Sequence, residues 1–270
     1  MQKNYPEIIP IKIGNFSVRF QDLGVKLPSI ENIPCFVFLI KEKNNSPILV
    51  DTGFSPFHVP GSGSDFKIEK SLEQSLEDLG YFPKDIKKII MTHLHWDHTG
   101  NLPLFKNADI YVNKDEITGL LHLMPNEETY FAPDYFVESL DRFILTNHSF
   151  KISENIEIVK TGFHSFGHQV VKVRTNGKTI VLAGDAPFSY SDLWKIIPDF
   201  AWEMYRKEKG KQFYWKEGIS EKIVKFLEKR KIENSKPFEM KAPVFEKDDI
   251  VYIAHDTSLD KTYKNKSVLN

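Results

Sequence analysis

The stretch MTHLHWDHTGN, residues 91–101, constrains the fold more than any other part of this 270-residue chain. Within six residues it gathers four side chains that bind metals, although the whole chain has only nine histidines: His93, His95, Asp97 and His98. In an extended segment residues i and i+2 point to the same side. His93 and His95 can therefore aim at one point from the end of a strand, and the next two would follow from a turn.

Imidazole and carboxylate donors suit Zn²⁺, and Mn²⁺, Fe²⁺ or Co²⁺ accept the same set. One ion would take the two strand histidines, and a second would take Asp97 and His98. Because four side chains cannot complete two sites, further ligands are expected downstream, at strand ends where a side chain is held rigidly. Three residues next to apolar strands meet that description: His168, Asp185 and His255.

Apolar periodicity predicts strands and helices in the alternating order of an α/β layer structure. Strands are expected at residues 7–14 and 16–20, as a pair within 34–54, and at 86–93, 107–113, 156–161 and 249–256, and residues 170–185 are expected to form strands around the Asn-Gly turn TNGK. Helices are expected at residues 67–83 and 219–231. The sequence shows no linker or low-complexity tract, so a single domain over residues 1–270 is expected.

Two segments rich in aromatic residues, near 114–150 and 188–217, fit the layers poorly. They are interpreted as insertions whose rings either pack on the core or line an apolar substrate pocket beside the metal loop.

Charge and composition narrow the class of protein. A net charge of −1 gives no electrostatic reason to bind nucleic acid or an anionic membrane. The single cysteine, Cys35, rules out internal disulfides and suits a reducing compartment. The chain shows no signal peptide and no apolar run long enough to span a bilayer. A cytoplasmic protein is therefore expected.

The motif THLHWDHTGN, with LVDTG upstream and GHQ, AGD and HD downstream, resembles the metallo-β-lactamase superfamily from about residue 35 to residue 256. The resemblance implies an αββα sandwich of two mixed β-sheets with outer helices and two metal ions at one sheet edge. It implies His93, His95 and His168 for one ion, Asp97, His98 and His255 for the other, and Asp185 as the bridge. Asp51 of LVDTG matches a position that orients metal ligands.

Within that superfamily the chain most resembles the N-acyl homoserine lactonases. The similarity rests on length, on a second histidine four residues before that of GHQ in HSFGH, on AGDAP and on AHD. The chain departs from the group at Gly162–Phe163, where Pro-Gly is usual, at Phe166, and at Phe188, where these lactonases have tyrosine. Tyr190 is the nearest phenol and the candidate to hydrogen-bond a developing oxyanion.

The function implied is the opening of a lactone, or the cleavage of a related carboxylic ester, by a hydroxide that bridges the two metal ions. Asp97 would deliver a proton to the leaving group. The substrate would be a small molecule with an apolar group, and a homodimer is left open.

A glyoxalase II-like thioesterase or a ribonuclease Z-like phosphodiesterase are the alternatives, supported only by a basic run at 204–216. A metal-stabilised scaffold without activity would be expected to lack some of the ligands.

Overall fold

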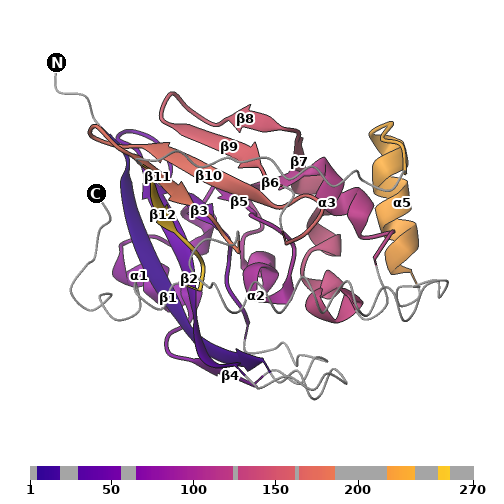
Figure 1. The fold of residues 1–270 in the computed structure, drawn as a ribbon, viewed down its shortest axis with the longest axis horizontal. Coiled ribbons are helices and arrows are strands. Elements are labelled where there is room, and N and C mark those ends of the chain that lie inside the picture. The colour runs from indigo at the N-terminus through magenta and orange to yellow at the C-terminus, as the bar shows by residue number, and fades with distance from the viewer. Residues whose placement is uncertain are drawn as a thin grey trace.

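The computed structural model describes residues 5–18, 30–55, 65–123, 127–161, 164–185, 218–234 and 249–255. Their strands form two mixed sheets that pack face to face (Figure 1). The larger sheet contains β1 (Glu7–Val18), β2 (Ile30–Lys41), β3 (Ile48–Val50), β4 (Asp65–Ile68), β5 (Lys88–Ile90), β6 (Asp109–Asn113) and β7 (Phe143–Thr146). The smaller sheet contains β8 (Ser149–Lys151), β9 (Ile156–Lys160), β10 (Gln169–Arg174), β11 (Thr179–Leu182) and β12 (Ile250–Tyr252).

The order of strands brings the ends of several parallel strands to one edge. The seven-stranded sheet has the order β4-β1-β2-β3-β5-β6-β7, and the five-stranded sheet has the order β12-β11-β10-β9-β8. Strands β3, β5, β6 and β7 pair in parallel, as do β11 and β12. Loops that follow parallel neighbours leave a sheet from the same edge, so residues after β3, β5, β11 and β12 can meet there.

Alternation along the strands separates two layers of core. In β2, Phe36, Phe38 and Ile40 belong to the cluster between the sheets, together with Val171 and Leu182 of the smaller sheet. The residues that alternate with them belong to a second cluster on the other face of the larger sheet: Cys35, Val37 and Leu39. Because side chains alternate across a strand with period two, one strand serves both layers, and the expected mixed α/β class is confirmed.

Helices cover the outer face of the larger sheet. Within the described ranges these are α1 (Leu72–Asp78), α2 (Trp96–Thr99), α3 (Lys114–Gly119) and α5 (Ile219–Lys229). The same ranges contain the short 3-10 helices η2 (Pro83–Asp85), η3 (Leu102–Leu104), η4 (Glu127–Tyr130), η5 (Pro133–Tyr135) and η6 (Val137–Arg142). Leu76, Ile117 and Phe226 bring α1, α3 and α5 into the outer cluster. The apolar face of α5, expected from its sequence, is thus buried against this layer.

Three segments differ from the expected elements. Residues 7–18 form one strand rather than two, because register shifts in its pairing with β2 absorb the irregular alternation. The expected helix at 67–83 is shorter: residues 65–68 pair with β1 as β4, and α1 begins only after Ser71, whose side chain accepts from Gln74 N. Residues 143–151 form β7 and β8, one strand in each sheet.

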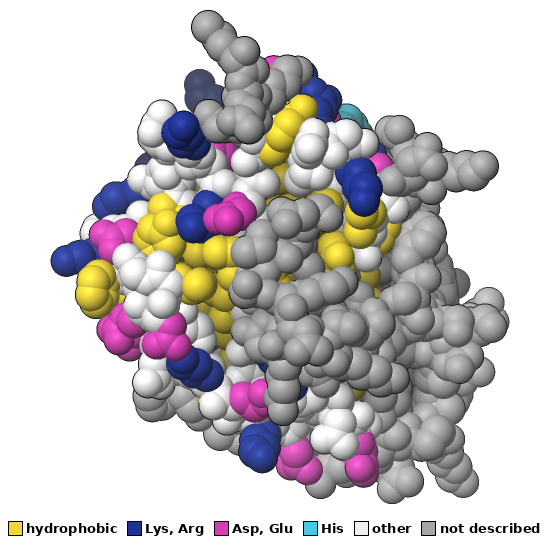
Figure 2. Space-filling view, turned by 90° about the vertical axis from the view of Figure 1, so that its left-hand side faces the viewer, with side chains coloured by type: hydrophobic (Ala, Val, Ile, Leu, Met, Phe, Trp, Pro, Cys, Tyr) yellow, Lys and Arg dark blue, Asp and Glu magenta, His cyan; other side chains and the backbone are white. Residues whose placement is uncertain are grey.

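The described part of the surface carries charges of both signs. Figure 2 shows lysine and arginine side chains interspersed with aspartate and glutamate on the face that it presents. Ion pairs such as Lys41 with Glu7 at 3.0 Å bring opposite charges together. None of the described helices combines the length and the apolar character needed to cross a bilayer.

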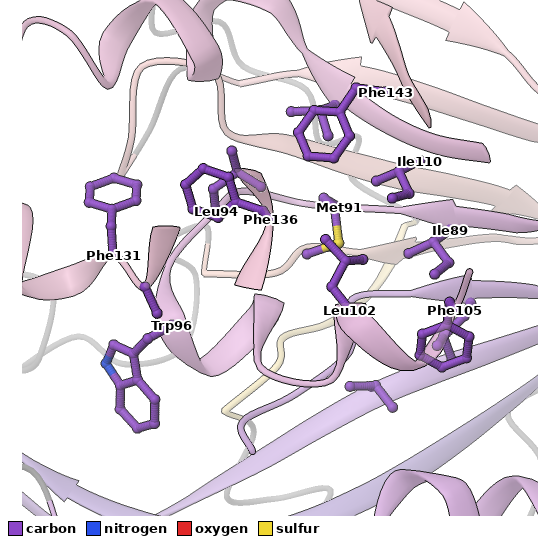
Figure 3. Packing of buried hydrophobic residues seen from close by; sticks show 14 of the residues in the cluster. Ile89, Met91, Leu94, Trp96, Leu102, Phe105, Ile110, Phe131, Phe136 and Phe143 are labelled. Carbon is purple, nitrogen blue, oxygen red and sulfur yellow. The ribbon is translucent and has the colours of Figure 1, made fainter. Parts of the chain in front are cut away.

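The loop after β5 is anchored by the outer cluster. Met91, Leu94 and Trp96 are all buried in that cluster, and they lie with Leu102 and Phe136 in Figure 3. The residues that alternate with Leu94 and Trp96 are the predicted metal ligands. Apolar packing on one side of this loop therefore fixes the direction of the polar side chains on the other.

Leu102 and Leu104, two residues apart in η3, provide a matched test of this anchor. Leu102 is fully buried, whereas Leu104 is 39% exposed. Leu102→Ala should lower the free energy of unfolding by about 2–5 kcal/mol, since it leaves a cavity, and Leu104→Ala should change it by only about 0.5 kcal/mol. Urea unfolding of the two variants measures the difference, and equal losses would contradict the packing described.

Candidate metal centre

The predicted ligands converge at the edge where β3, β5, β11 and β12 end. His93, His95, Asp97 and His98 follow β5, while Asp185 and His255 follow the parallel pair β11 and β12. The connection from β9 to β10 reaches the same edge and carries His164. The side chains fall into two groups close enough to hold metal ions: His93, His95 and His164 in the first, and Asp97, His98, Asp185 and His255 in the second.

The first group consists of three imidazoles that face one another. His164 Nε2 lies 3.1 Å from His93 Nε2 and 2.9 Å from His95 Nδ1. Burial lowers the pKa of His93 and His95 well below the usual value, and it lowers the pKa of His164 to about 4. Three neutral, convergent ring nitrogens are the donor set that divalent transition metals prefer.

The second group mixes carboxylates and imidazoles. His255 Nε2 lies 3.1 Å from Asp97 Oδ2 and 3.3 Å from Asp185 Oδ1, and His98 Nε2 lies 3.2 Å from the same Asp185 oxygen. Within the described part of the chain, three of these buried atoms are not aligned for any hydrogen bond: His98 Nε2, His255 Nε2 and Asp185 Oδ1. Because buried polar atoms are normally paired, their convergence indicates a site for a ligand.

Electrostatics in the second group favour a cation. Burial alone would lower the pKa of His255, but Asp185 and Asp97 outweigh it and raise the pKa to about 10. Burial would likewise raise the pKa of Asp185, but His255 and His98 hold it well below the usual range. Positive charge on the imidazoles balances the carboxylates, and a divalent cation would supply that charge in place of their protons.

Asp185 touches both groups. Its Oδ2 lies 3.4 Å from His164 Nε2, and its Oδ1 faces His98 and His255. With one Asp185 oxygen on each side, each group offers four donors, the number that tetrahedral zinc takes. The residues present therefore fit two divalent cations that share one carboxylate.

Asp51 orients the second group from behind. Its Oδ2 accepts from Thr92 Oγ1 at 2.8 Å and lies 2.9 Å from His98 Nδ1, and its Oδ1 accepts from Thr92 N at 2.7 Å. On the other side, His255 Nδ1 lies 2.8 Å from Pro34 O. These contacts occupy the Nδ1 atoms of both histidines, which turns each Nε2 toward the site.

The structure places His164, rather than His168, beside His93 and His95. His168 is fully buried, and both its ring nitrogens have other partners: Nδ1 lies 2.7 Å from Thr161 Oγ1, and Nε2 accepts from Asp185 N at 3.2 Å. Burial lowers the pKa of His168 to about 3, so the ring is neutral and can accept this bond. His168 therefore supports Asp185 instead of joining the first group.

His164 is a functional residue that sequence reasoning missed. In the sequence, His164 supports only the resemblance carried by HSFGH. It was not among the predicted ligands, because it does not directly follow a predicted strand. In the structure it has a positive φ of 69°, a left-handed conformation that strand periodicity does not anticipate. Two histidines four residues apart were the available signal.

Aromatic side chains border the two groups. The rings of Phe131 and Tyr130 lie 4.8 and 5.5 Å from that of His95, and Phe16 packs on His255 at 5.0 Å. Phe131 and Tyr130 come from the segment 114–150, so part of that segment does lie beside the metal loop. Phe188, Tyr190 and the rest of the segment 188–217 lie outside the described residues.

His164 and His168 can be told apart by metal content. His164→Ala should reduce the metal bound by about one ion per chain, since it removes one of three first-group donors. His168→Gln keeps an acceptor for Asp185 N and should retain both ions, with a lower midpoint of thermal unfolding. Inductively coupled plasma mass spectrometry on metal-replete samples measures the ratio. Loss of an ion from the His168 variant alone would restore the assignment made from sequence.

Comparison with known proteins agrees with this geometry. The family model of the metallo-β-lactamase superfamily matches residues 31–214. An N-acyl homoserine lactonase of Bacillus cereus is 31% identical over 187 residues, covering 62% of this chain and 69% of that protein. A probable metallo-hydrolase of Methanocaldococcus jannaschii is 30% identical over 131 residues, covering 48% of this chain and 52% of that protein.

Solved structures share the fold. A mutant of the Bacillus thuringiensis enzyme AiiA with N-decanoyl-L-homoserine at its active site has a TM-score of 0.60 and 20% identity, over 96% of this chain and 97% of that one. AidC, a dizinc quorum-quenching lactonase, has a TM-score of 0.57 and 17% identity, over 77% of this chain and 83% of that one. The αββα fold expected from the sequence is thereby confirmed. The family model, the similar relatives and the two groups of metal-ligand side chains at one sheet edge all agree. The chain therefore belongs to the metallo-β-lactamase superfamily.

Proposed function

We propose that this metal-dependent hydrolase opens the ring of a lactone, or cleaves a related carboxylic ester, at a centre of two divalent cations. Zn²⁺ is the metal that the donors suit best, and Mn²⁺, Fe²⁺ or Co²⁺ accept the same set. The relatives named N-acyl homoserine lactonase support an acylated homoserine lactone as the class of substrate.

The observation that carries this proposal is the position of Asp185. One of its oxygens faces His164 of the first group, and the other faces His98 and His255 of the second. A carboxylate shared in this way is the arrangement that holds two metal ions about 3.5–4 Å apart in hydrolases. Under this proposal His93, His95 and His164 hold one ion, and Asp97, His98 and His255 hold the other.

When bound, two such cations would lower the pKa of a water molecule to about 7 and polarise a carbonyl oxygen. Asp97 lies among the ligands, with Oδ2 3.1 Å from His255 Nε2, and Cys35 Sγ contacts its carbonyl oxygen at 3.5 Å. The Asp97 carboxylate would take the proton that the attacking water releases and pass it to the ring oxygen as the carbon–oxygen bond breaks.

The aromatic border suits a substrate with an apolar group. Phe131 and Tyr130 pack against His95, and they give the first group an apolar side where an acyl chain would lose contact with water. A phenol that donates to the carbonyl oxygen would complete the site, and Tyr190 is the residue proposed for it.

A panel of substrates tests the proposal directly. The metal-replete protein should hydrolyse N-acyl homoserine lactones and simple esters well above thioesters and phosphodiesters, because its site is proposed to fit a ring ester. Turnover would be followed with a pH indicator for lactones and esters, thiol release for thioesters and nitrophenol release for phosphodiesters. Preference for thioesters or phosphodiesters would favour the glyoxalase II-like or ribonuclease Z-like alternative instead.

Tyr190→Phe should reduce lactone turnover by about 10²–10³-fold while leaving metal content unchanged, since it removes one donor to the developing oxyanion. Tyr130→Phe is the matched control: its ring lies on His95, but its hydroxyl is not proposed to act. Steady-state rates on one lactone compare the variants. Should Tyr130→Phe be the variant that loses turnover, the phenol would belong to η4 and Tyr190 would have no such role.

A further inference from the structure

We infer that Glu116 is the positioning residue of the first metal group: it ties the loop carrying His93 and His95 to the loop carrying His164. This inference rests on the dinuclear centre proposed above. Glu116 lies in α3, outside the ligand sequence motifs, and its side chain is only 3% exposed. It contacts neither ion-binding group directly, so any influence must pass through the two loops.

The contacts of Glu116 connect both loops. Its Oε1 accepts from Leu94 N at 3.0 Å, and Leu94 stands between His93 and His95. Its Oε2 accepts from Ser165 Oγ at 2.7 Å and from Gly167 N at 2.9 Å, on either side of the turn that follows His164. One carboxylate thus receives three hydrogen bonds from loops that are about seventy residues apart along the chain.

The loop that carries His164 packs closely against α3. A methyl group added at Gly167 would lie 2.1 Å from Glu116 N, and one added at Gly119 would lie 2.7 Å from the ring of Phe166. Both glycines therefore permit contacts that any larger residue would prevent. The loop bearing His164 is seated on α3 over the same turn from which Glu116 reaches the first loop.

The carboxyl group of Glu116 is buried and accepts hydrogen bonds from both loops. Burial raises the pKa of the Glu116 carboxyl above its usual value, and the hydrogen bonds from Ser165, Leu94 and Gly167 offset that increase only in part. All three groups that contact the carboxyl are donors, from Leu94 N, Ser165 Oγ and Gly167 N, so Glu116 acts as an acceptor for both loops. For the second group Asp51 has the corresponding positioning role, because its carboxylate contacts His98 directly.

The experiment compares two neighbouring carboxylates of α3. Glu116→Gln keeps the shape of the side chain but can accept only through one oxygen, and Glu116→Ala removes the link. Asp115→Asn is the matched control, because Asp115 pairs with Lys160 rather than with the ligand loops. Each purified holoenzyme would be titrated with a competing chelator, and Co²⁺-loaded protein would be followed by its visible absorption spectrum.

We expect Glu116→Ala to weaken the binding of the metal ion held by the first group by about 10–100-fold, the loss of affinity typical when an outer contact of metal ligands is removed. Glu116→Gln should fall between it and the wild type, and the cobalt spectrum of the first group should change in both. Asp115→Asn should match the wild type in affinity and spectrum. If the alanine variant does not fold, the glutamine variant alone decides the result.

The outcomes separate this inference from the proposed function. A wild type that binds two ions and opens lactones, together with a Glu116→Gln variant of unchanged affinity and spectrum, would overturn the role of Glu116 alone. A variant that only melts at lower temperature, with metal affinity intact, would do the same. A wild type that binds fewer than two ions would instead overturn the dinuclear centre.

Discussion

Burial of two carboxylates beside five imidazoles is the constraint on which the rest of the structure depends. Asp97 and Asp185 lie with His98 and His255 at an edge where each is less than a tenth exposed, and such groups are costly to bury unless charge and hydrogen bonds compensate. Protons on the imidazoles, or metal ions in their place, provide that compensation. The surrounding sheets keep these side chains in mutual contact.

Residues outside the two metal-binding groups help to hold the ligands in place. Asp51, at positive φ after β3, bonds both Thr92 and His98, while His168 accepts from the backbone of Asp185. Glu116 performs a comparable role for the first group, from a helix rather than a strand end. Partners from other elements therefore hold the ring of His98, the backbone of Asp185 and the two loops of the first group, which makes a site built from loops rigid.

Sequence reasoning succeeded where a local pattern determines the outcome. The apolar run CFVFLI before a polar turn predicted a strand within residues 34–54, and the tight spacing of His93 to His98 predicted where metal ligands gather. It failed where distant contacts decide. Ile68 has helical spacing from Leu72, yet pairing with β1 makes it a strand. His168 stands before a strand as a ligand would, but Thr161 and Asp185 N occupy its ring, and His164 takes the expected place.

The loop after β5 also limits how this protein can change in evolution. Between residues 93 and 97, side chains that face the metal centre alternate with Leu94 and Trp96, which are buried in the apolar core. Insertion or deletion of a single residue there would exchange the two sides, placing imidazoles in the core and apolar groups at the site. This segment can therefore vary in the identity of its buried residues but not in its length.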